Sequence, residues 1–295
     1  MTIFWVDQSI AQELAISLKL NLFFSYSMAS LIGKRKHLSM SPLTPSLLGS
    51  KSKMTQEKTF NDPVHKAIKM SGLCLRVIDT REFQRLGYLK QLGCCDKVFR
   101  GATHTRFIHS LGVAHLAEKL IYILKDNQPE LGITERDLIS VKMAGLCHDL
   151  GHGPFSHVFD GVFMKAMHPK GIVIEGKDGL YPWKHEMASI DMLEHLLEVN
   201  HIDITDYGLD DIDLVFIKEM IEGVDVDKRV GRDKKKAFLY DIVNNVVSGL
   251  DVDKLDYFMR DMMMTTVNYR SDFSRYIIIY IYCYYTSTLS LSLLL

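Results

Sequence analysis

The chain has 295 residues, of which 47% are hydrophobic and 24% charged, and its formal net charge is -1. This length and balance allow a sizeable core and exclude an intrinsically disordered chain. The near-zero net charge excludes a global electrostatic attraction to nucleic acid. The five cysteines are odd in number and irregularly spaced, which favours reduced thiols and an intracellular protein.

The first segment, residues 1 to 57, is predicted to be poorly ordered. Charges at Asp7, Glu13 and Lys19 interrupt its apolar opening, so no stretch there is long enough to cross a bilayer. It also has no clean signal-peptide pattern. The basic residues 34 to 36 form either a solvated segment or a weak nuclear address, and we expect the nucleus rather than the cytoplasm.

Order is predicted to begin near Lys58, and the letters FNDPVH that follow indicate a turn. Residues 67 to 92 have apolar side chains at mostly helical spacing, which predicts two helices. A longer helix is predicted over residues 103 to 124, with His109 on its apolar face and Arg106 on the same turn. A lone histidine on such a face is usually a packed core residue, whereas an arginine beside it is suited to gripping a phosphate.

The stretch AGLCHDLGHGPFSHVFD, residues 144 to 160, concentrates histidines and aspartates among glycines and apolar residues. Thr134, with Asp137 three residues later, is typical of a helix start, and this helix places His148 and Asp149 on or beside its buried face. A buried carboxylate next to an imidazole is costly unless a metal or partner compensates. The alternative is a His-Asp hydrogen bond that only ties the helix end to a loop.

The glycines and proline of residues 151 to 154 are predicted to end this helix. The turn that they make is expected to bring His152 and His157 back toward the same point. Two distant residues, His109 and Asp253, are predicted to supply further ligands. The leading hypothesis is therefore a metal-centred hydrolytic site.

Helical spacing continues downstream. Residues 168 to 183 are typical of an exposed loop that leads to His185, and the basic run at residues 232 to 236 is predicted to be a solvated loop. No convincing alternating strand pattern is found between residues 60 and 275, so the predicted fold class is all-α. Further helices are predicted over residues 187 to 197, 211 to 221 and 237 to 247.

The run GLDVDKLDYFMRD, residues 249 to 261, is the second informative stretch. Asp253, Tyr257 and Asp261 lie four residues apart and share one helical face, which combines a ligand, a stacking ring and an acceptor. Lys254 lies near the helix start, where it can reach a phosphate. The alternative is a solvated acidic helix.

The final residues, 276 to 295, contain no charge and are long enough to span a bilayer. Their tyrosine-rich start and the absence of basic residues after it favour an unrelated ending on a shortened domain over a membrane anchor. We expect no membrane association.

Six ordered motifs resemble those of the HD phosphohydrolase superfamily, and within it the animal SAM-and-HD-domain deoxynucleoside triphosphate triphosphohydrolases. The resemblance implies a helical HD domain over residues 58 to 275 that cleaves a dNTP into a deoxynucleoside and inorganic triphosphate. The motifs are FNDPVH, DTREFQRLGYLKQLG, HTRFIHSLGVAHLA, AGLCHDLGHGPFSHVFDG, KHE and GLDVDKLDYFMRD.

The resemblance also implies a role for each position that matches the family motifs, and these roles together describe one reaction centre. Two imidazoles with two carboxylates suit Fe, Zn or Mn, and Mg²⁺ is expected with the triphosphate. The implied metal ligands are His109, His148, Asp149 and Asp253. The implied catalytic residues are His185 as general acid, Asp160, which orients it, and His152 and His157, which line the phosphate path. The implied substrate residues are Arg106 and Lys254 for phosphates and Gln91, Leu92, Tyr257 and Asp261 around the deoxyribose.

Family members are activated by nucleotides that bridge subunits into tetramers, so GTP or dNTP and further copies of the chain are implied partners. Gly87 stands where the family has an arginine that reads guanine, and the helical lobe expected after Arg275 is absent from the sequence. We therefore expect weakened oligomers and impaired activity. The alternatives are a catalytically weak module that binds nucleotide or single-stranded nucleic acid, and an HD hydrolase of another phosphate ester. The positions that match the regulatory sites are Lys58, Asn61, Asp79, Gln84 and Arg275.

Overall fold

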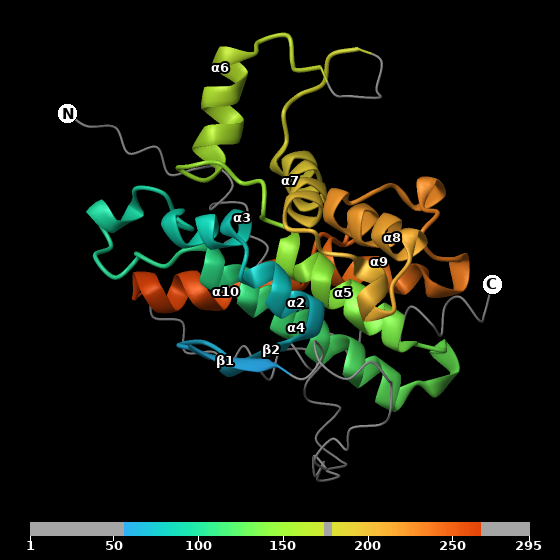
Figure 1. Ribbon diagram of the computed structural model, residues 1–295. Helices are drawn as coiled ribbons and strands as arrows, with labels where there is room; N and C mark the ends of the chain where they lie inside the picture. The colour runs from blue at the N-terminus through green and yellow to red at the C-terminus, as the bar shows by residue number, and fades with distance from the viewer. Residues whose placement is uncertain (1–55, 174–178, 267–295) are drawn as a thin grey trace, which may run out of the picture. The chain divides into compact units, whose positions relative to one another are not determined.

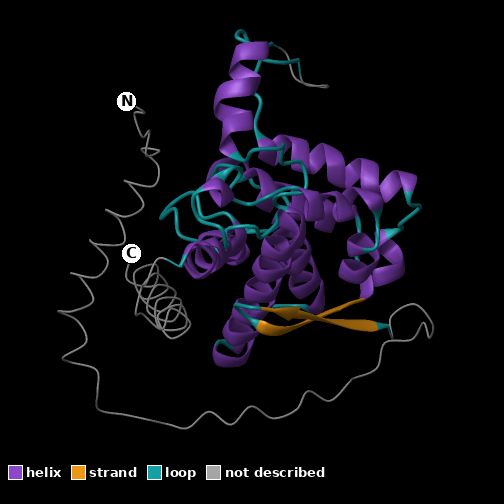
Figure 2. Ribbon diagram, turned by 90° about the vertical axis from the view of Figure 1, so that its left-hand side faces the viewer, coloured by secondary structure: helices purple, strands orange, loops and turns teal. Residues whose placement is uncertain are grey.

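The computed structural model describes residues 56 to 173 and 179 to 266. Within these ranges the protein is mainly α-helical, with one two-stranded antiparallel sheet (Figures 1 and 2). The predicted helical fold class is therefore confirmed. The tail at residues 276 to 295, and nearly all of the N-terminal segment 1 to 57, lie outside the described residues.

A β-hairpin precedes the first described helix, and the sequence analysis missed it. β1 (Glu57–Asp62) pairs antiparallel with β2 (Lys66–Ser71). The predicted turn is confirmed, because Asp62 accepts hydrogen bonds from two backbone N–H groups between the strands. Of β2, only Ile68 and Met70 are buried, and an alternation this short cannot be distinguished from helical spacing.

The core is built around α4 (Arg106–Asn127) and α5 (Glu135–Cys147), which pack along each other. The apolar face predicted for α4 is confirmed, since the side chains of that face are buried. α4 is long and apolar enough to cross a membrane, but 61% of that stretch is buried inside the protein, as in a core helix. α10 (Val252–Thr265) and β2 pack against α4, and α8 (Asp211–Glu222) packs against α5.

The region predicted as a helix over residues 237 to 247 is shorter than expected. A 3₁₀ helix (Lys234–Leu239) leads into α9 (Tyr240–Val243), where the regular turns end. Asn245 stops the helix, because its side-chain oxygen accepts hydrogen bonds from two following backbone N–H groups and so competes with helical pairing. The other short helices are α2 (Gly72–Ile78), α3 (Arg81–Gln84) and 3₁₀ turns at Arg85–Tyr88, Cys95–Lys97, Pro129–Leu131, Ile204–Tyr207 and Val226–Lys228.

The basic run at residues 232 to 236 is only partly the solvated loop that was predicted. Lys235 is exposed, but Arg232 makes ion pairs with Asp137 at 2.7 Å and Asp213 at 2.6 Å. Lys236 also pairs with Asp137. Both carboxylates are buried in the core, so the run folds inward to neutralise them.

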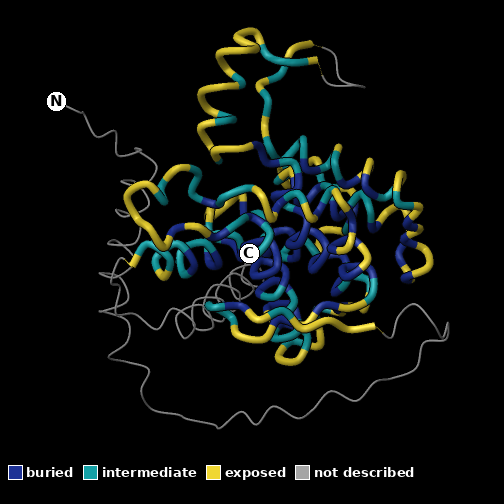
Figure 3. Tube along the Cα trace, turned by 60° about the vertical axis from the view of Figure 1, so that its left-hand side comes forward, coloured by how far each residue is buried: buried dark blue, intermediate teal, exposed yellow. Residues whose placement is uncertain are grey.

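A helical arm leaves the body of the domain after α5 (Figures 1 and 3). It consists of a π-helical turn (Phe159–Met164) followed by α6 (Lys165–Met167), and much of its surface is exposed. The chain returns to the body at α7 (His185–Val199), which agrees with the predicted helix. Residues 174 to 178 of the predicted loop lie outside the described ranges.

Candidate metal centre and histidine cluster

Three segments far apart in the sequence bring the four predicted metal ligands together. α4 supplies His109, the turn after α5 supplies His148 and Asp149, and α10 supplies Asp253. One ligand atom from each of His109, His148 and Asp253 lies within 4.8 Å of the others. Asp149 Oδ2 lies 3.7 Å from the Nε2 atoms of both histidines. This convergence involves more groups than either alternative, a packed core histidine or a simple His-Asp tie.

The orientation of the two imidazoles suits a cation. His109 Nδ1 lies 2.7 Å from Asp256 Oδ2, and His148 Nδ1 lies 2.8 Å from the Gly145 carbonyl oxygen. Because each Nδ1 donates to an oxygen, each Nε2 presents a lone pair once its ring is deprotonated, as metal binding requires. The two Nε2 atoms are 3.2 Å apart. In the deprotonated rings these lone pairs would face each other and repel, and a shared metal ion would remove that repulsion.

The charge at this centre also favours a cation. Burial lowers the pKa of His109, but hydrogen bonds to Asp253 and Asp256 outweigh burial and raise that pKa to about 10. Burial raises the pKa of Asp253, and its contacts with His109 and His148 outweigh this effect and lower it. A proton shared by these groups balances the buried carboxylate, and a divalent ion is suited to replace it.

Arg106, predicted to bind phosphate, reaches the same centre from the first turn of α4. Its buried guanidinium makes an ion pair with Asp149 Oδ2 and donates a hydrogen bond to Ser156 Oγ. Burial raises the pKa of Asp149, but the charges of Arg106 and of the neighbouring histidines together outweigh burial and hold that pKa well below its usual value. The arginine is therefore fixed beside the predicted metal ligands, with its charge partly neutralised.

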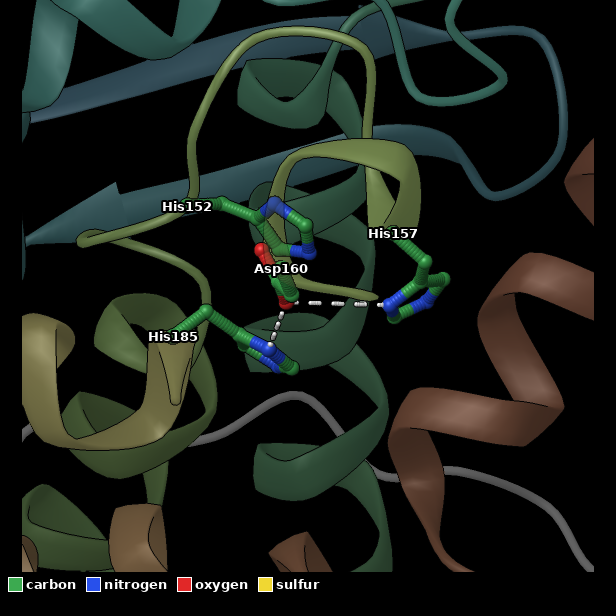
Figure 4. Close-up of side chains that lie close together, drawn as sticks. All are labelled: His152, His157, Asp160 and His185. Carbon is green, nitrogen blue, oxygen red and sulfur yellow. Dashed lines mark hydrogen bonds and ion pairs between the residues drawn. The ribbon is translucent and has the colours of Figure 1, made fainter. Parts of the chain in front are cut away.

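The four predicted catalytic residues form a second group, which we call the histidine cluster: His152, His157, Asp160 and His185. Their side chains point toward one another (Figure 4). Asp160 Oδ2 lies 2.8 Å from His185 Nδ1 and 3.8 Å from His157 Nδ1. The rings of His152 and His185 stack, with centroids 4.4 Å apart.

α7 delivers His185 to this cluster because Gly151 lets its backbone come close. A Cβ atom at Gly151 would lie 2.1 Å from the carbonyl carbon of Ala188 and 2.2 Å from the backbone nitrogen of Ser189. The Gly151 N–H instead donates a hydrogen bond to Ser189 Oγ at 2.9 Å. α5 itself ends at Cys147, earlier than the predicted end at residues 151 to 154, and Gly151 in the turn that follows docks α7.

Electrostatics separate the roles within the histidine cluster. Burial lowers the pKa of His152 to about 3, so this ring is neutral at pH 7. Burial also lowers the pKa of His185, but its hydrogen bond to Asp160 and the charges of the nearby carboxylates together outweigh burial and raise it. Burial raises the pKa of Asp160, and hydrogen bonds from His157 and His185 outweigh this effect and lower it. His185 thus carries a proton more readily than His152 does.

Two of the predicted deoxyribose residues meet at a histidine that sequence reasoning did not single out. The Gln91 N–H donates to the His104 carbonyl oxygen at 3.0 Å, and Asp261 Oδ1 lies 2.6 Å from His104 Nε2. The Gln91 side chain is buried, and Leu92 after it is half-buried. The structure therefore joins Gln91 and Asp261 through His104.

The other two predicted substrate residues of α10 lie near its start. The Tyr257 ring centroid lies 6.4 Å from that of His109, which places the ring beside the metal ligands. Lys254 Nζ lies 3.3 Å from Asp251 Oδ2, and the side chain is about a third exposed. The helical face predicted for residues 253 to 261 is confirmed as part of a helix that packs on α4.

Three of the predicted regulatory residues come together at the end of α2. Lys58 Nζ lies 2.8 Å from Asp79 Oδ1, and both side chains are exposed. Gln84 Nε2 donates to the last carbonyl oxygen of α2 at 2.8 Å. Asn61 is exposed on β1, without a contact that joins it to this group, and Arg275 lies outside the described residues.

Sequence reasoning missed Asp256, which links the metal ligands to the hairpin. Its Oδ2 contacts His109 Nδ1, and its Oδ1 lies 2.6 Å from His65 Nε2. Arg260 donates to both Asp256 oxygens and also to Asp62 Oδ2 at 2.8 Å. The spacing of four residues between Asp256 and Arg260 was the available signal.

Comparison with known proteins agrees with this geometry. The HD domain family matches residues 106 to 214. The chain is 49% identical over 231 residues to deoxynucleoside triphosphate triphosphohydrolase SAMHD1 of Gallus gallus, covering 75% of this chain and 36% of that protein. The Homo sapiens protein of the same name is 46% identical over 230 residues, covering 75% and 35%. A Dictyostelium discoideum homolog is 41% identical over 224 residues, covering 76% and 40%.

The helical core, the converging histidines and aspartates, and the matched family define an HD-domain protein. Over the matched residues the chain belongs with the SAMHD1-like HD-domain proteins. The family predicted from the motifs is therefore confirmed. The chain spans little more than a third of the length of the Gallus gallus and Homo sapiens relatives.

Proposed function

We propose that this chain hydrolyses dNTPs to deoxynucleosides and inorganic triphosphate. The observation that carries the proposal is the pair of imidazole Nε2 atoms 3.2 Å apart beside Asp253 and Asp149. A triphosphate needs charge neutralisation, and its leaving 5′ oxygen needs a proton. The first need fits this centre, and the second fits the His185–Asp160 pair. The substrate class is that in the names of the similar proteins.

The proposed metal ligands are His109, His148, Asp149 and Asp253. Their mixed imidazole and carboxylate donors suit Fe, Zn or Mn, and we expect Mg²⁺ to accompany the triphosphate. A divalent ion bound there supplies polarisation of the phosphate and activation of water. Arg106 is held beside Asp149, where it can share its charge with an arriving phosphate oxygen.

His185 is the proposed proton donor. Asp160 accepts the hydrogen on His185 Nδ1 at 2.8 Å, which leaves Nε2 as the nitrogen that donates to the leaving oxygen. His152 and His157, whose rings both contact that of His185, are proposed to line the phosphate path. The neutral His152 ring can take part as a hydrogen-bonding group without adding a charge.

The sugar is proposed to bind between α10 and the segment around Gln91. This segment is held next to α4, because Lys90 forms a β-bridge with Thr105, the residue before α4. Tyr257 supplies a ring beside His109, and His104 fixes the Asp261 carboxylate. Polar groups held this rigidly discriminate between sugars that differ by one hydroxyl. The remaining proposed contacts are Gln91 and Leu92 with the sugar and Lys254 with a phosphate.

A regulatory nucleotide is proposed to bind near the end of α2, where Lys58, Asp79 and Gln84 gather. Asn61 and Arg275 are proposed to contribute, together with a second copy of the chain. Gly87 is exposed and has no side chain to read a base, so we propose that guanine specificity is reduced.

The test is a direct turnover assay on the full chain. Each dNTP and each ribonucleotide is incubated with the protein, and released triphosphate is separated by ion chromatography. We expect triphosphate from dNTPs only, and loss of both metal and turnover in Asp253→Ala. The exposed Asp227→Ala is the matched control and should change neither. Binding of nucleotide or single-stranded nucleic acid without triphosphate release would contradict the proposal and favour a binding module.

A further inference from the structure

The histidine cluster has the composition of a metal site in its own right. One ligand atom from each of its four residues lies within 4.8 Å of the others, and none of them belongs to the set His109, His148 and Asp253. Three imidazoles and one carboxylate are the donors of a four-coordinate site. The arrangement therefore offers a second ion a complete set of protein ligands.

His152 provides an independent sign that a ligand belongs here. It is 1% exposed, and within the described ranges neither of its ring nitrogens has a hydrogen-bond partner. Asp160 Oδ1 is likewise buried without a partner there. Buried polar atoms are rarely left unpaired in folded proteins, so both atoms point to a group that completes the cluster.

The geometry selects a cation. The Asp160 carboxylate lies among the ring nitrogens, 2.8 Å from His185 Nδ1 and 3.8 Å from His157 Nδ1 (Figure 4). An anion entering the cluster would meet this negative charge, whereas a cation would be neutralised by it. Ligand atoms around a tetrahedral zinc ion lie about 3.3 Å apart because the bonds are about 2.0 Å long. The distances from Asp160 to His185 and to His157 lie on either side of that value.

The cluster can be reached from solvent through His157. This side chain is 71% exposed, in contrast to the buried His152. It follows Phe155 and Ser156, whose φ angles of 64° and 55° make a tight turn. His157 is therefore the outer member of the cluster, and His152, Asp160 and His185 are its inner members.

We propose that His152, His157, Asp160 and His185 bind a second divalent transition-metal ion of the zinc class. Imidazole donors favour Zn²⁺, Co²⁺ or Ni²⁺ over Mg²⁺. One consequence rests on the proposed function: an ion that holds a nitrogen of His185 removes the proton donor, so occupancy of the cluster inhibits turnover. The binding itself is independent of that function.

The test uses Co²⁺ alone, because four-coordinate Co²⁺ absorbs visible light whereas Zn²⁺ does not. The folded full chain is titrated with Co²⁺, and bound metal is measured by equilibrium dialysis together with the absorption spectrum. We expect two binding events per chain. Asp160→Asn and His157→Ala should each weaken the second event about 100-fold or more and leave the first. Asp253→Ala should remove the first only, and the exposed His168→Ala should retain both.

A chain that takes up a single Co²⁺ ion would overturn the proposal. So would a second event that persists in both Asp160→Asn and His157→Ala. Circular dichroism confirms that the variants are folded, and the exposed His157 can be replaced without disturbing the core. Since metal uptake is measured without substrate, its failure is distinguishable from a failure of dNTP hydrolysis.

Discussion

The orientation of His109, a proposed metal ligand, depends on a carboxylate that is not among the proposed ligands. Asp256 accepts the hydrogen of His109 Nδ1 at 2.7 Å and so directs Nε2 toward His148. We expect Asp256→Asn to weaken metal binding by about 10- to 100-fold, since the partner of a ligating histidine sets its tautomer. Metal retained after dialysis against increasing chelator measures the effect, with Asp227→Asn as control. Unchanged retention by a folded variant would count against this role.

His185 gives a second prediction for a single residue, which depends on the proposed dNTP hydrolysis. Replacing it by glutamine removes the proton donor and should lower kcat by about 100- to 10,000-fold. Metal at His109 and Asp253 should be retained, because His185 belongs to the other cluster. Turnover and metal content measured on the same preparation test both statements. The exposed His195→Gln, on the same helix, is the matched control.

Sequence patterns singled out histidines and aspartates that the structure gathers into two groups, but not all of their partners. The density of histidine and aspartate around His148, and the place of His109 on an apolar face, follow from local spacing. Asp256 contacts His109 across 147 positions and His65 across 191, and His104 contacts Asp261 across 157. Such pairs depend on how helices pack, which local periodicity does not specify.

Among the elements, the docking of α7 on the loop after α5 is sensitive to a single added methyl group. A Cβ at Gly151 would lie 2.1 Å from the backbone of Ala188, which cannot move as a side-chain end can. We expect Gly151→Ala to cost about 1 to 3 kcal/mol of stability and to displace His185. Gly161→Ala is the control, because its Cβ would meet nothing within 4 Å. Equal denaturation midpoints for the two variants would refute the expectation.

Element boundaries were predictable where the signal is local. α5 begins as predicted because Asp137 accepts from the Thr134 N–H at 2.9 Å, and the Asp137 N–H donates back to Thr134 Oγ1 at 3.3 Å. The hairpin before α2 was not predictable in the same way. Its strands are short, and the apolar side chains of β2 are buried because the strand packs against α4. Local spacing does not show this packing.

At the scale of the whole molecule, a buried charge network joins α5, α8 and the segment before α9. Arg232 bridges Asp137 and Asp213, whose side chains are 1% and 0% exposed. We expect Arg232→Met to lower the free energy of unfolding by about 3 to 5 kcal/mol, because it leaves buried carboxylates without a full set of partners. Lys235→Ala should change it by less than about 0.5 kcal/mol, since Lys235 is exposed. Urea unfolding of the full chain decides between these outcomes.

No local pattern could have predicted this network, because Asp137 lies 95 positions from Arg232 and 99 from Lys236. A basic run is usually solvated, and its exposed member Lys235 follows that rule. The capping role of Asp137 could be predicted from the sequence. Its hydrogen bonds from Arg232 and Lys236 are known only from the fold.

The same network predicts how stability depends on pH. Burial raises the pKa of Asp137, but hydrogen bonds from Lys236, Thr134 and Arg232 outweigh burial and lower it. A carboxyl group whose pKa is lower in the folded than in the unfolded chain stabilises the fold above its unfolded pKa of about 3.9. That contribution is lost as the pH falls through the folded value, because protonation leaves the cations beside Asp137 without their partner charge.

We therefore expect the melting temperature to fall as the pH drops below about 4. Between about pH 5 and 7 Asp137 stays ionised, so its contribution to the melting temperature should be constant. Asp137→Asn should be less stable than the parent at neutral pH, and the difference should shrink as the pH is lowered, because the parent loses the same charge by protonation. Thermal unfolding followed by circular dichroism from about pH 3 to 7 measures both curves. A difference that stays constant over this range would show that Asp137 acts through its packing and cap rather than through its charge.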